Sequence, residues 1–389
     1  MTEDVEVVVA GHICLDIIPT LPEVKGDLGE LLAPGKLLAV GPAVVSTGGA
    51  VSNTGQALHR LGFRTRLMAR VGDDVIGRDI LEVVRRTDER LAEGISVVPG
   101  GASSYTVVIN PPGRDRSFLH CPGVNDTFGA DDVDCDALGA ARLFHFGYPP
   151  AMRRMFADGG AGCARMFRRV KALGVTTSLD MTMPDPSSEA ARVDWTTFLE
   201  RVLPHVDIFA PSVEETLFML DRKRWETSPE ADGPLLSGLS ECVMKMGAAI
   251  VVLKLGEEGL YLRTTPDAAR LTAMGRLAPE PPDAWVGREL LVPCFEVTVA
   301  GTTGAGDATV AGFLGGMLKG LAPEACATAA VAVGAASVER PDATSGVPHW
   351  DVIQERIRAG WPRRTIDLPL PGWTVDAQRT MWSGPADAP

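Results

Sequence analysis

The sequence predicts an α/β fold in which helices cover both faces of a mostly parallel central sheet. Short β-branched or apolar runs alternate with segments of helical period, a pattern typical of parallel sheets. Two regions break the alternation and predict a small separate β flap. The first run, residues 5–10, ends at Gly11, as a buried parallel strand does. We expect further strands at residues 65–71, 143–146, 176–180, 206–209 and 250–253.

Helical segments are expected between these strands. They fall at residues 52–61, 75–86, 151–173, 213–220 and 236–246. The longest apolar stretch, residues 325–338, is Ala-rich and too short to cross a bilayer. It therefore predicts a buried helix, and we expect no membrane partner.

The flap, or lid, is expected from residues 13–47 and 95–120. The first region is rich in Pro, Gly and Leu, and the second holds two β-like runs around a Pro-Pro-Gly turn, which together predict a small antiparallel sheet. Residues 264–291 contain several prolines and are expected to form a surface insertion. We expect one domain over residues 1–360, with the lid as part of it. The Pro-rich tail, residues 361–389, is expected to be draped over the surface or disordered.

Composition excludes some classes of function. The 389 residues carry a formal net charge of −13, which argues against a nucleic-acid-binding surface. The seven cysteines are scattered and never spaced as CxxC, so free thiols in a reducing compartment are expected, and a zinc site is not. From its acidic start, we expect no secretory signal. These features predict a cytoplasmic protein.

The strongest local signal is the glycine-rich turn Gly301-Thr-Thr-Gly-Ala-Gly-Asp307. An apolar strand at residues 295–299 is expected to lead into it and a helix to lead out, so successive N–H groups would point at one anion. Asp307 stands where a Walker A loop has Lys, and the run does not match GxGxxG. An acid beside an anion site suits a base that accepts the proton of an attacking hydroxyl. Taken alone, Asp307 could equally be a helix cap.

Two N-terminal features could hold a hydroxylated ligand. Gly48 and Gly49 open the run GGAVSN, where small residues allow close backbone approach and Asn53 offers a donor and an acceptor. Asp16 follows the first strand at its carboxyl end, the edge where open α/β sheets bind ligands. Each feature alone could be an ordinary turn or a loop acid.

Taken in order, these segments resemble the ribokinase family, also called the PfkB family of carbohydrate kinases. The resemblance covers residues 5–350 and implies a ribokinase-like fold with a lid. It rests on the Asp16 strand, GGAVSN, VGDDVIG at 71–77, the flap with Arg114 and Arg116, PSVEE at 211–215, LKLGEEG at 253–259 and GTTGAGD at 301–307.

The resemblance implies transfer of a phosphoryl group from ATP to a hydroxyl of a small sugar or sugar derivative. Asp307 would be the general base, and the amides of Gly304, Ala305 and Gly306 the anion hole. Glu215 would act on Mg²⁺ through water. The acceptor would be held by Asp16, Gly48, Gly49 and Asn53, with Arg116 reaching a phosphate or remaining a solvated hairpin charge. The nucleotide would lie along Lys254, Gly256, Gly259 and Thr302. The lid often forms a dimer contact in this family, so a homodimer is expected.

The chain departs from the family pattern at three positions. Gly301 replaces the Asp that often helps to bind a monovalent cation, which leaves dependence on K⁺ open. Ser212 replaces the usual Asn of the NxxE element, and Ala50 replaces the Lys of ribokinases, so ribose is not favoured over other sugars. None of these changes removes the base or the anion hole.

Two alternatives remain open at this point. A nucleoside kinase on the same scaffold would need an apolar or aromatic slot for the base, and Tyr105 and Phe118 are candidates for it. A catalytically silent sugar-binding regulator would keep the pocket, but it would have no need of Asp307.

Overall fold

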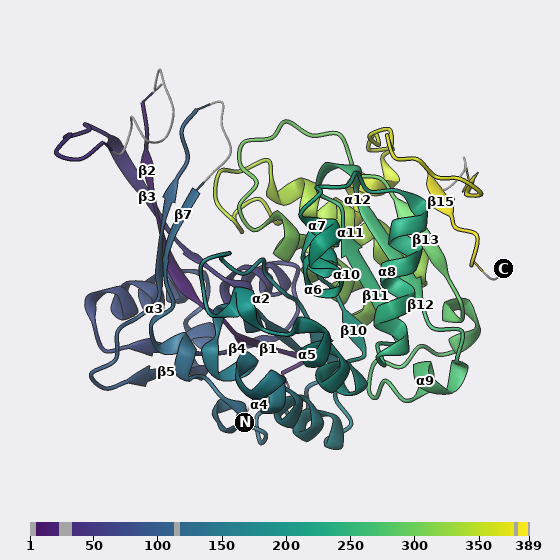
Figure 1. The fold of residues 1–389 in the computed structure, drawn as a ribbon, viewed down its shortest axis with the longest axis horizontal. Helices are drawn as coiled ribbons and strands as arrows, with labels where there is room; N and C mark the ends of the chain where they lie inside the picture. The colour runs from purple at the N-terminus through teal and green to yellow at the C-terminus, as the bar shows by residue number, and fades with distance from the viewer. Residues whose placement is uncertain (1–4, 23–32, 113–116, 377–379, 388–389) are drawn as a thin grey trace.

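The computed structural model describes residues 5–22, 33–112, 117–376 and 380–387. Its main feature is an 11-stranded sheet in the order β14-β15-β13-β12-β11-β10-β9-β8-β1-β4-β5, with helices on both faces (Figure 1). The strands from β11 to β5 pair in parallel, and the four strands on the other side are antiparallel. The parallel strands are β1 (Val7–Gly11), β4 (Thr65–Gly72), β5 (Ile95–Val98), β8 (Leu143–Gly147), β9 (Thr176–Leu179), β10 (Ile208–Phe209) and β11 (Ile250–Lys254).

The two faces of the sheet belong to two hydrophobic cores. Val7 and Val9 of β1 enter one core, while Val8 and Ala10 enter the other, as the period of two along a strand requires. The first core takes residues of α2 (Ala50–Arg60), α3 (Val75–Thr87), α10 (Ala305–Leu318), α11 (Pro323–Ser337) and α12 (Trp350–Arg358). The second takes residues of α4 (Arg153–Ala172), α5 (Trp195–Val202), α6 (Val213–Leu220) and α8 (Gly233–Lys245). The short helices α7 (Arg222–Trp225) and α9 (Ala268–Thr272) lie in connections.

These elements confirm the strands and helices predicted between residues 5 and 253 and the buried Ala-rich helix, now α11. The helix predicted at residues 151–173 is interrupted, because residues 157–160 have non-helical backbone angles inside α4. No helix in the described part of the chain is both long and apolar enough to cross a membrane.

The antiparallel side of the sheet corrects two expectations. Residues 264–291 are not only a surface insertion, because they lead into β13 (Glu289–Val292), which is fully buried between β12 (Leu260–Thr264) and β15. The tail is neither merely draped nor disordered where it is described. It forms β14 (Thr374–Asp376) and β15 (Met381–Ser383), and β15 pairs with β13.

The strand expected at residues 295–299 is absent, although this segment is described. Phe295 makes a single isolated bridge with Arg363 and stacks on Trp361 with ring centroids 4.5 Å apart. Pro293, two residues before this segment, has no N–H to donate to a neighbouring strand. Val299, at its end, is 56% exposed, so its apolar side chain lies outside the core.

The lid is a separate four-stranded sheet that projects from the body (Figure 1). Its order is β3-β2-β6-β7, from β2 (Cys14–Thr20), β3 (Gly41–Gly48), β6 (Tyr105–Ile109) and β7 (Ser117–Cys121). It comes from the two predicted regions, but β2 and β6 pair in parallel, so the lid is mixed rather than antiparallel. Residues 95–98 belong to the main sheet as β5.

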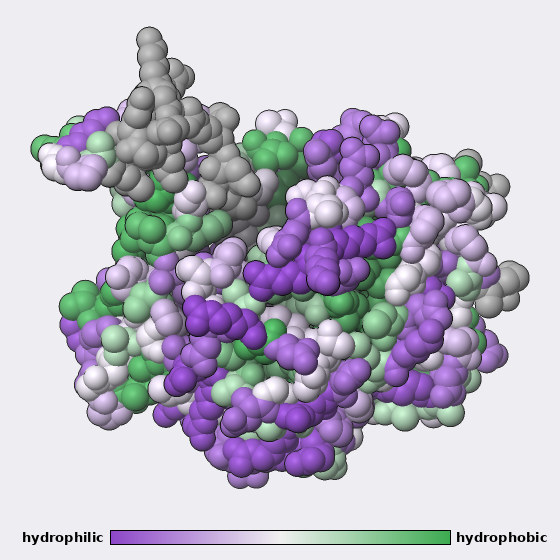
Figure 2. Space-filling view, in the orientation of Figure 1, coloured by the Kyte–Doolittle hydropathy of each residue, from purple (hydrophilic) through white to green (hydrophobic). Residues whose placement is uncertain are grey.

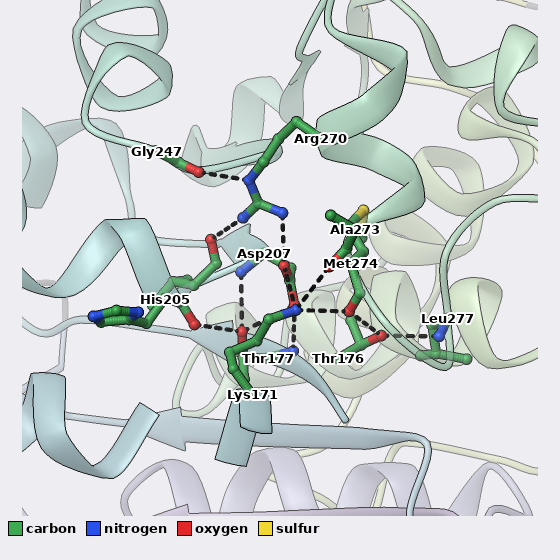
Figure 3. Close-up of polar contacts among 11 residues, drawn as sticks. Lys171, Thr176, Thr177, His205, Asp207, Gly247, Arg270, Ala273, Met274 and Leu277 are labelled. Atoms are coloured by element: carbon green, nitrogen blue, oxygen red, sulfur yellow. Dashed lines mark hydrogen bonds and ion pairs between the residues drawn. The ribbon is translucent and has the colours of Figure 1, made fainter. Parts of the chain in front are cut away.

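A buried carboxylate, Asp207, ties several elements together at the amino ends of the parallel strands (Figure 3). Its oxygens accept bonds from Lys171 Nζ (2.8 and 3.0 Å), from Arg270 Nη1 (2.8 Å) and from the backbone N–H of Thr177 (2.8 Å). Lys171 also reaches the carbonyl oxygens of Ala273 and Met274. This cluster therefore stabilises the end of the sheet opposite to the one that carries the candidate site.

Candidate active site

The glycine-rich turn delivers Asp307 to the first turn of α10. Gly304 begins this helix in the left-handed region, with φ of 73°, and a Cβ there would lie 2.5 Å from the Cβ of Ala343. The residues Gly304, Ala305 and Gly306 are half-buried at the helix N-terminus. Their position gives the turn the N–H groups and the partial positive charge that an anion requires.

Asp307 itself is 5% exposed and is held by donors from two other elements. Asn53 Nδ2 donates to Oδ2 at 3.0 Å, and Thr54 Oγ1 donates to Oδ1 at 3.1 Å, both from α2. The hydroxyl of Tyr148, just beyond β8, also donates to Oδ1. Burial and the charge of Asp307 raise the pKa of Tyr148 well above its usual value, so its hydroxyl stays a donor. The carboxylate is therefore fixed in direction before any ligand arrives.

A second cluster stands beside the anion turn. Lys254 Nζ donates to Asp180 Oδ1 (2.6 Å) and to the carbonyl oxygen of Ala210 (2.8 Å). The Lys254 side chain passes Gly306 so closely that a Cβ there would lie 3.4 Å from its Cδ. Glu215 begins α6 in a reciprocal capping box with Ser212, so the serine preserves the local structure of the NxxE element.

The charges of this cluster act on one another. Burial raises the pKa of Asp180, and the Lys254 ammonium opposes that shift. Burial likewise raises the pKa of Glu215, again opposed by Lys254. The pKa of Lys254 is raised because the nearby carboxylates of Asp180, Glu215 and Asp307 outweigh the effect of its own burial. Lys254 therefore remains a cation among three acids.

The predicted acceptor residues meet where the lid joins the body. Asp16 is 7% exposed, and a Cβ on Gly48 would lie 2.2 Å from its Oδ2, so a side chain at position 48 would displace the Asp16 carboxylate. Gly49 has φ of 85°, and a Cβ there would lie 2.4 Å from His12 Nδ1. A chain of contacts runs from Asp16 through Cys14 Sγ and Thr106 to His120 on β7.

The remaining predicted residues that the structure describes are not among the side chains that contact Asp307 or Lys254. Gly256 and Gly259 form the turn after β11 with positive φ, and a Cβ on Gly259 would lie 2.1 Å from the carbonyl oxygen of Val292. Thr302 is exposed in the turn before α10. Arg116, like Arg114, lies outside the described residues.

Sequence reasoning did not include four residues that the structure places in the candidate site: Tyr148, Asp180, His12 and Thr54. Tyr148, Asp180 and His12 directly follow β8, β9 and β1, so each lies at a carboxyl strand end. The rule that ligands bind at that edge makes such positions candidates, but which of them lie near Asp307 depends on the order of the strands in the sheet. Thr54 follows the predicted Asn53 and faces the same carboxylate.

Buried polar atoms without a partner gather around this site. Within the described ranges they include both ring nitrogens of His12, Asn53 Oδ1, His145 Nε2 and Asp180 Oδ2. An unsatisfied buried polar group costs about 1–3 kcal/mol, and native proteins pair nearly all such groups. The concentration of these atoms around Asp307 and Lys254 indicates a site for a polar ligand.

Comparison with known proteins identifies the family of the chain. A family model described as "pfkB family carbohydrate kinase" matches residues 5–350. The chain belongs to the pfkB family of carbohydrate kinases. Its activity is the phosphorylation of a sugar hydroxyl by ATP. This confirms the resemblance seen in the sequence.

Individual pfkB relatives agree with this assignment. An uncharacterized sugar kinase of Archaeoglobus fulgidus is 28% identical over 75% of this chain and 98% of its own length. A 2-dehydro-3-deoxygluconokinase of Bacillus subtilis is 26% identical over 82% of this chain and 87% of its own. Among solved structures, Arabidopsis thaliana ribokinase complexed with ribose and ATP superimposes with a TM-score of 0.68 and 19% identity, covering 91% of this chain and 98% of the ribokinase chain. The last comparison confirms the ribokinase-like fold.

Proposed function

We propose that this pfkB kinase transfers the γ-phosphoryl group of ATP to a sugar hydroxyl with Asp307 as general base. The observation that carries the proposal is the position of Asp307, fixed by Asn53, Thr54 and Tyr148 beside the accessible N-terminus of α10. A carboxylate offers about four lone-pair sites, and these donors leave room for the acceptor hydroxyl. The hydroxyl oxygen attacks the γ-phosphorus, its proton passes to Asp307, and ADP leaves.

Charge that develops on the transferring group would be stabilised by fixed donors. The amides of Gly304, Ala305 and Gly306 serve as the anion hole because they lie at a helix N-terminus. Lys254 uses two of its three N–H groups on Asp180 and Ala210, so the third can reach a phosphate oxygen beside Gly306. Gly256, Gly259 and Thr302 would border the rest of the nucleotide.

The residues also fit a magnesium ion. Mg²⁺ prefers carboxylate and water oxygens, and Asp180 Oδ2 is buried without a partner beside Glu215 and Lys254. Asp180 and Glu215 would hold the ion, Glu215 through water. When bound, Mg²⁺ neutralises charge on the phosphates of ATP.

The acceptor would lie between the lid and the body, held by Asp16, Gly48, Gly49 and Asn53. Hydrogen bonds from these groups and closure of the lid would exclude water, which would otherwise accept the phosphoryl group. The relatives named above act on different sugars or sugar acids, so the acceptor is to be found by experiment.

The lid also supports a proposed homodimer. Val45, Ile17, Val107 and Leu119 form one cross-strand row over all four lid strands, and the two outer residues are 49% and 56% exposed. Asp16 and His120 lie on the opposite face, because strand residues alternate between faces. Figure 2 shows apolar surface on the lid.

All seven cysteines are free in the structure, which agrees with a reducing, cytoplasmic location.

The test is release of ADP in the presence of Mg²⁺ with a panel of D-fructose, D-ribose, 2-dehydro-3-deoxy-D-gluconate and adenosine. The proposal expects one sugar to give rapid ADP release that an Asp307→Asn variant lacks. Adenosine as the best acceptor would instead identify a nucleoside kinase. Binding of a sugar without ADP release above the variant would identify a sugar-binding regulator.

A further inference from the structure

His12 is a buried imidazole whose hydrogen-bonding capacity is unused. It directly follows β1 and is 4% exposed, and neither Nδ1 nor Nε2 has a partner. Its backbone is well held, since its N–H donates to the carbonyl oxygen of Gly147 (2.7 Å) and its carbonyl oxygen accepts from Val51 (3.1 Å). The backbone hydrogen bonds therefore fix the position of His12, although its ring makes no hydrogen bond to the protein.

The ring lies between Gly49, which is proposed to hold the acceptor, and Tyr148, which is bound to the proposed base Asp307. On one side it touches Gly49, where a Cβ would come within 2.4 Å of Nδ1. On the other side its centroid is 6.3 Å from that of Tyr148, whose hydroxyl is bound to Asp307. The His120 ring on the lid is 5.2 Å away and is linked to Asp16 through Thr106 and Cys14. His120 is exposed and Tyr148 is half-buried, so solvent reaches the side chains on either side of the buried His12 ring.

The protonation state of the His12 ring determines which kind of group it can bind. Burial, and secondarily the neighbouring His120, lowers the pKa of His12 to about 3, so the ring is neutral at ordinary pH. A neutral imidazole donates through one nitrogen and accepts through the other. A hydroxyl can pair with either nitrogen, whereas an ionised carboxylate can pair only with the N–H.

We propose that His12 is a specificity-determining residue that hydrogen-bonds a hydroxyl of the sugar acceptor. This inference rests on the proposed function and adds His12 to the residues that hold the acceptor. It also predicts that the part of the acceptor beside His12 carries hydroxyls and no charge. Because a site built to bond a hydroxyl is left with unpaired groups when the hydroxyl is missing, His12 would also reject the corresponding deoxy sugar.

The test compares three substitutions with the parent enzyme, using the best acceptor of the ADP-release panel. His12→Phe keeps a ring and removes both nitrogens, and it should lower kcat/KM for the acceptor by about 10- to 100-fold while KM for ATP is unchanged. His12→Asn offers an amide as far from Cβ as Nδ1, and His12→Gln offers one as far away as Nε2. One of the two should recover part of the loss and so identify the bonding nitrogen.

Stability separates a binding role from a structural one. Since His12→Phe removes unpaired buried polar atoms, its thermal midpoint without acceptor should equal or exceed that of the parent. The rise in midpoint that the acceptor produces should be smaller in the variant. If His12→Phe does not fold, the same comparison is made with the Asn and Gln variants, one of which should show the smaller rise.

Unchanged kcat/KM for the acceptor and an unchanged acceptor-induced midpoint shift in all folded variants would overturn the role of His12. Failure of the proposed function would look different, because the parent itself would then release no ADP with any acceptor. The midpoint shift does not depend on turnover, so the shift measured with each sugar of the panel still tests His12 in that case.

Discussion

At the scale of single residues, the site depends on carboxylates whose direction is set by neighbours from distant parts of the chain. Asn53 and Asp307 are 254 residues apart, yet their side chains bond at 3.0 Å. The motifs around them are local, so the sequence alone predicted Asp307, Asn53 and Gly49. It did not predict Tyr148 or Asp180, because a single residue after a strand carries no motif. Their relevance appears only when the order of β8 and β9 in the sheet is known.

Buried histidines predict how stability depends on pH. Burial lowers the pKa values of His12 and His145 to about 3, with smaller effects from His120 and Lys254 respectively. The unfolded chain binds a proton at each histidine below about pH 6.5 and the folded chain does not, so the free energy of unfolding falls as pH drops from 6.5 towards 3. Each histidine contributes up to about 1.4 kcal/mol per pH unit in that window.

We therefore expect His145→Asn, which keeps a polar atom for the bond to Ser178, to show a shallower loss of stability in acid. Urea unfolding at several pH values between 4.5 and 7.5 measures this slope. An identical slope for parent and variant would contradict the assignment of a neutral buried ring.

At the scale of elements, Asp207 holds β10 to α4 and α9 by charge (Figure 3). Asp207 is fully buried, whereas Lys171 and Arg270 are 21% and 22% exposed. Asp207→Ala leaves these two cations without their anion and should lower the free energy of unfolding by about 3 kcal/mol, the lower end of the range for broken buried pairs. Asp131→Ala is the matched control, because Asp131 pairs with Arg165 and Arg169 but is 65% exposed.

The control should change stability by under about 1 kcal/mol. Urea titration of the three proteins provides the comparison. Equal effects of the two substitutions would show that the Asp207 cluster does not stabilise this end of the sheet.

Element prediction failed mainly on the antiparallel side of the sheet. The tail strands β14 and β15 have three residues each and lie in a Pro-rich segment, so no strand period could be recognised there. Residues 295–299 were expected to be a strand because they are apolar. Their actual partner is the distant segment around Trp361 and Arg363, and contact with it depends on tertiary structure.

At the scale of the whole molecule, the lid is proposed to join two subunits. Leu119→Asp places a charge in the row of Val45, Ile17 and Val107 and should convert a dimer into a monomer, because burying an unpaired charge is unfavourable. Phe118→Asp is the control: it is similarly exposed, at 54%, but points to the face that carries His120. Light scattering after size-exclusion chromatography measures the mass of each.

The control should remain dimeric. A monomeric parent, or dissociation caused by Phe118→Asp alone, would contradict this use of the lid. The sequence predicted that a lid exists, but it could not show which residues share a face, because the face depends on the pairing register of four strands.

The central claim is that Asp307 removes the proton of the acceptor hydroxyl, and Asp307→Asn tests it most directly. Asparagine keeps the size of the side chain and can still bond Thr54 and Tyr148 through its oxygen, but it cannot take up the proton. With the best acceptor, kcat should fall by about 10²–10⁴-fold, while the dissociation constant for ATP, measured by calorimetry, should be nearly unchanged. Equal turnover by variant and parent would contradict the role of Asp307.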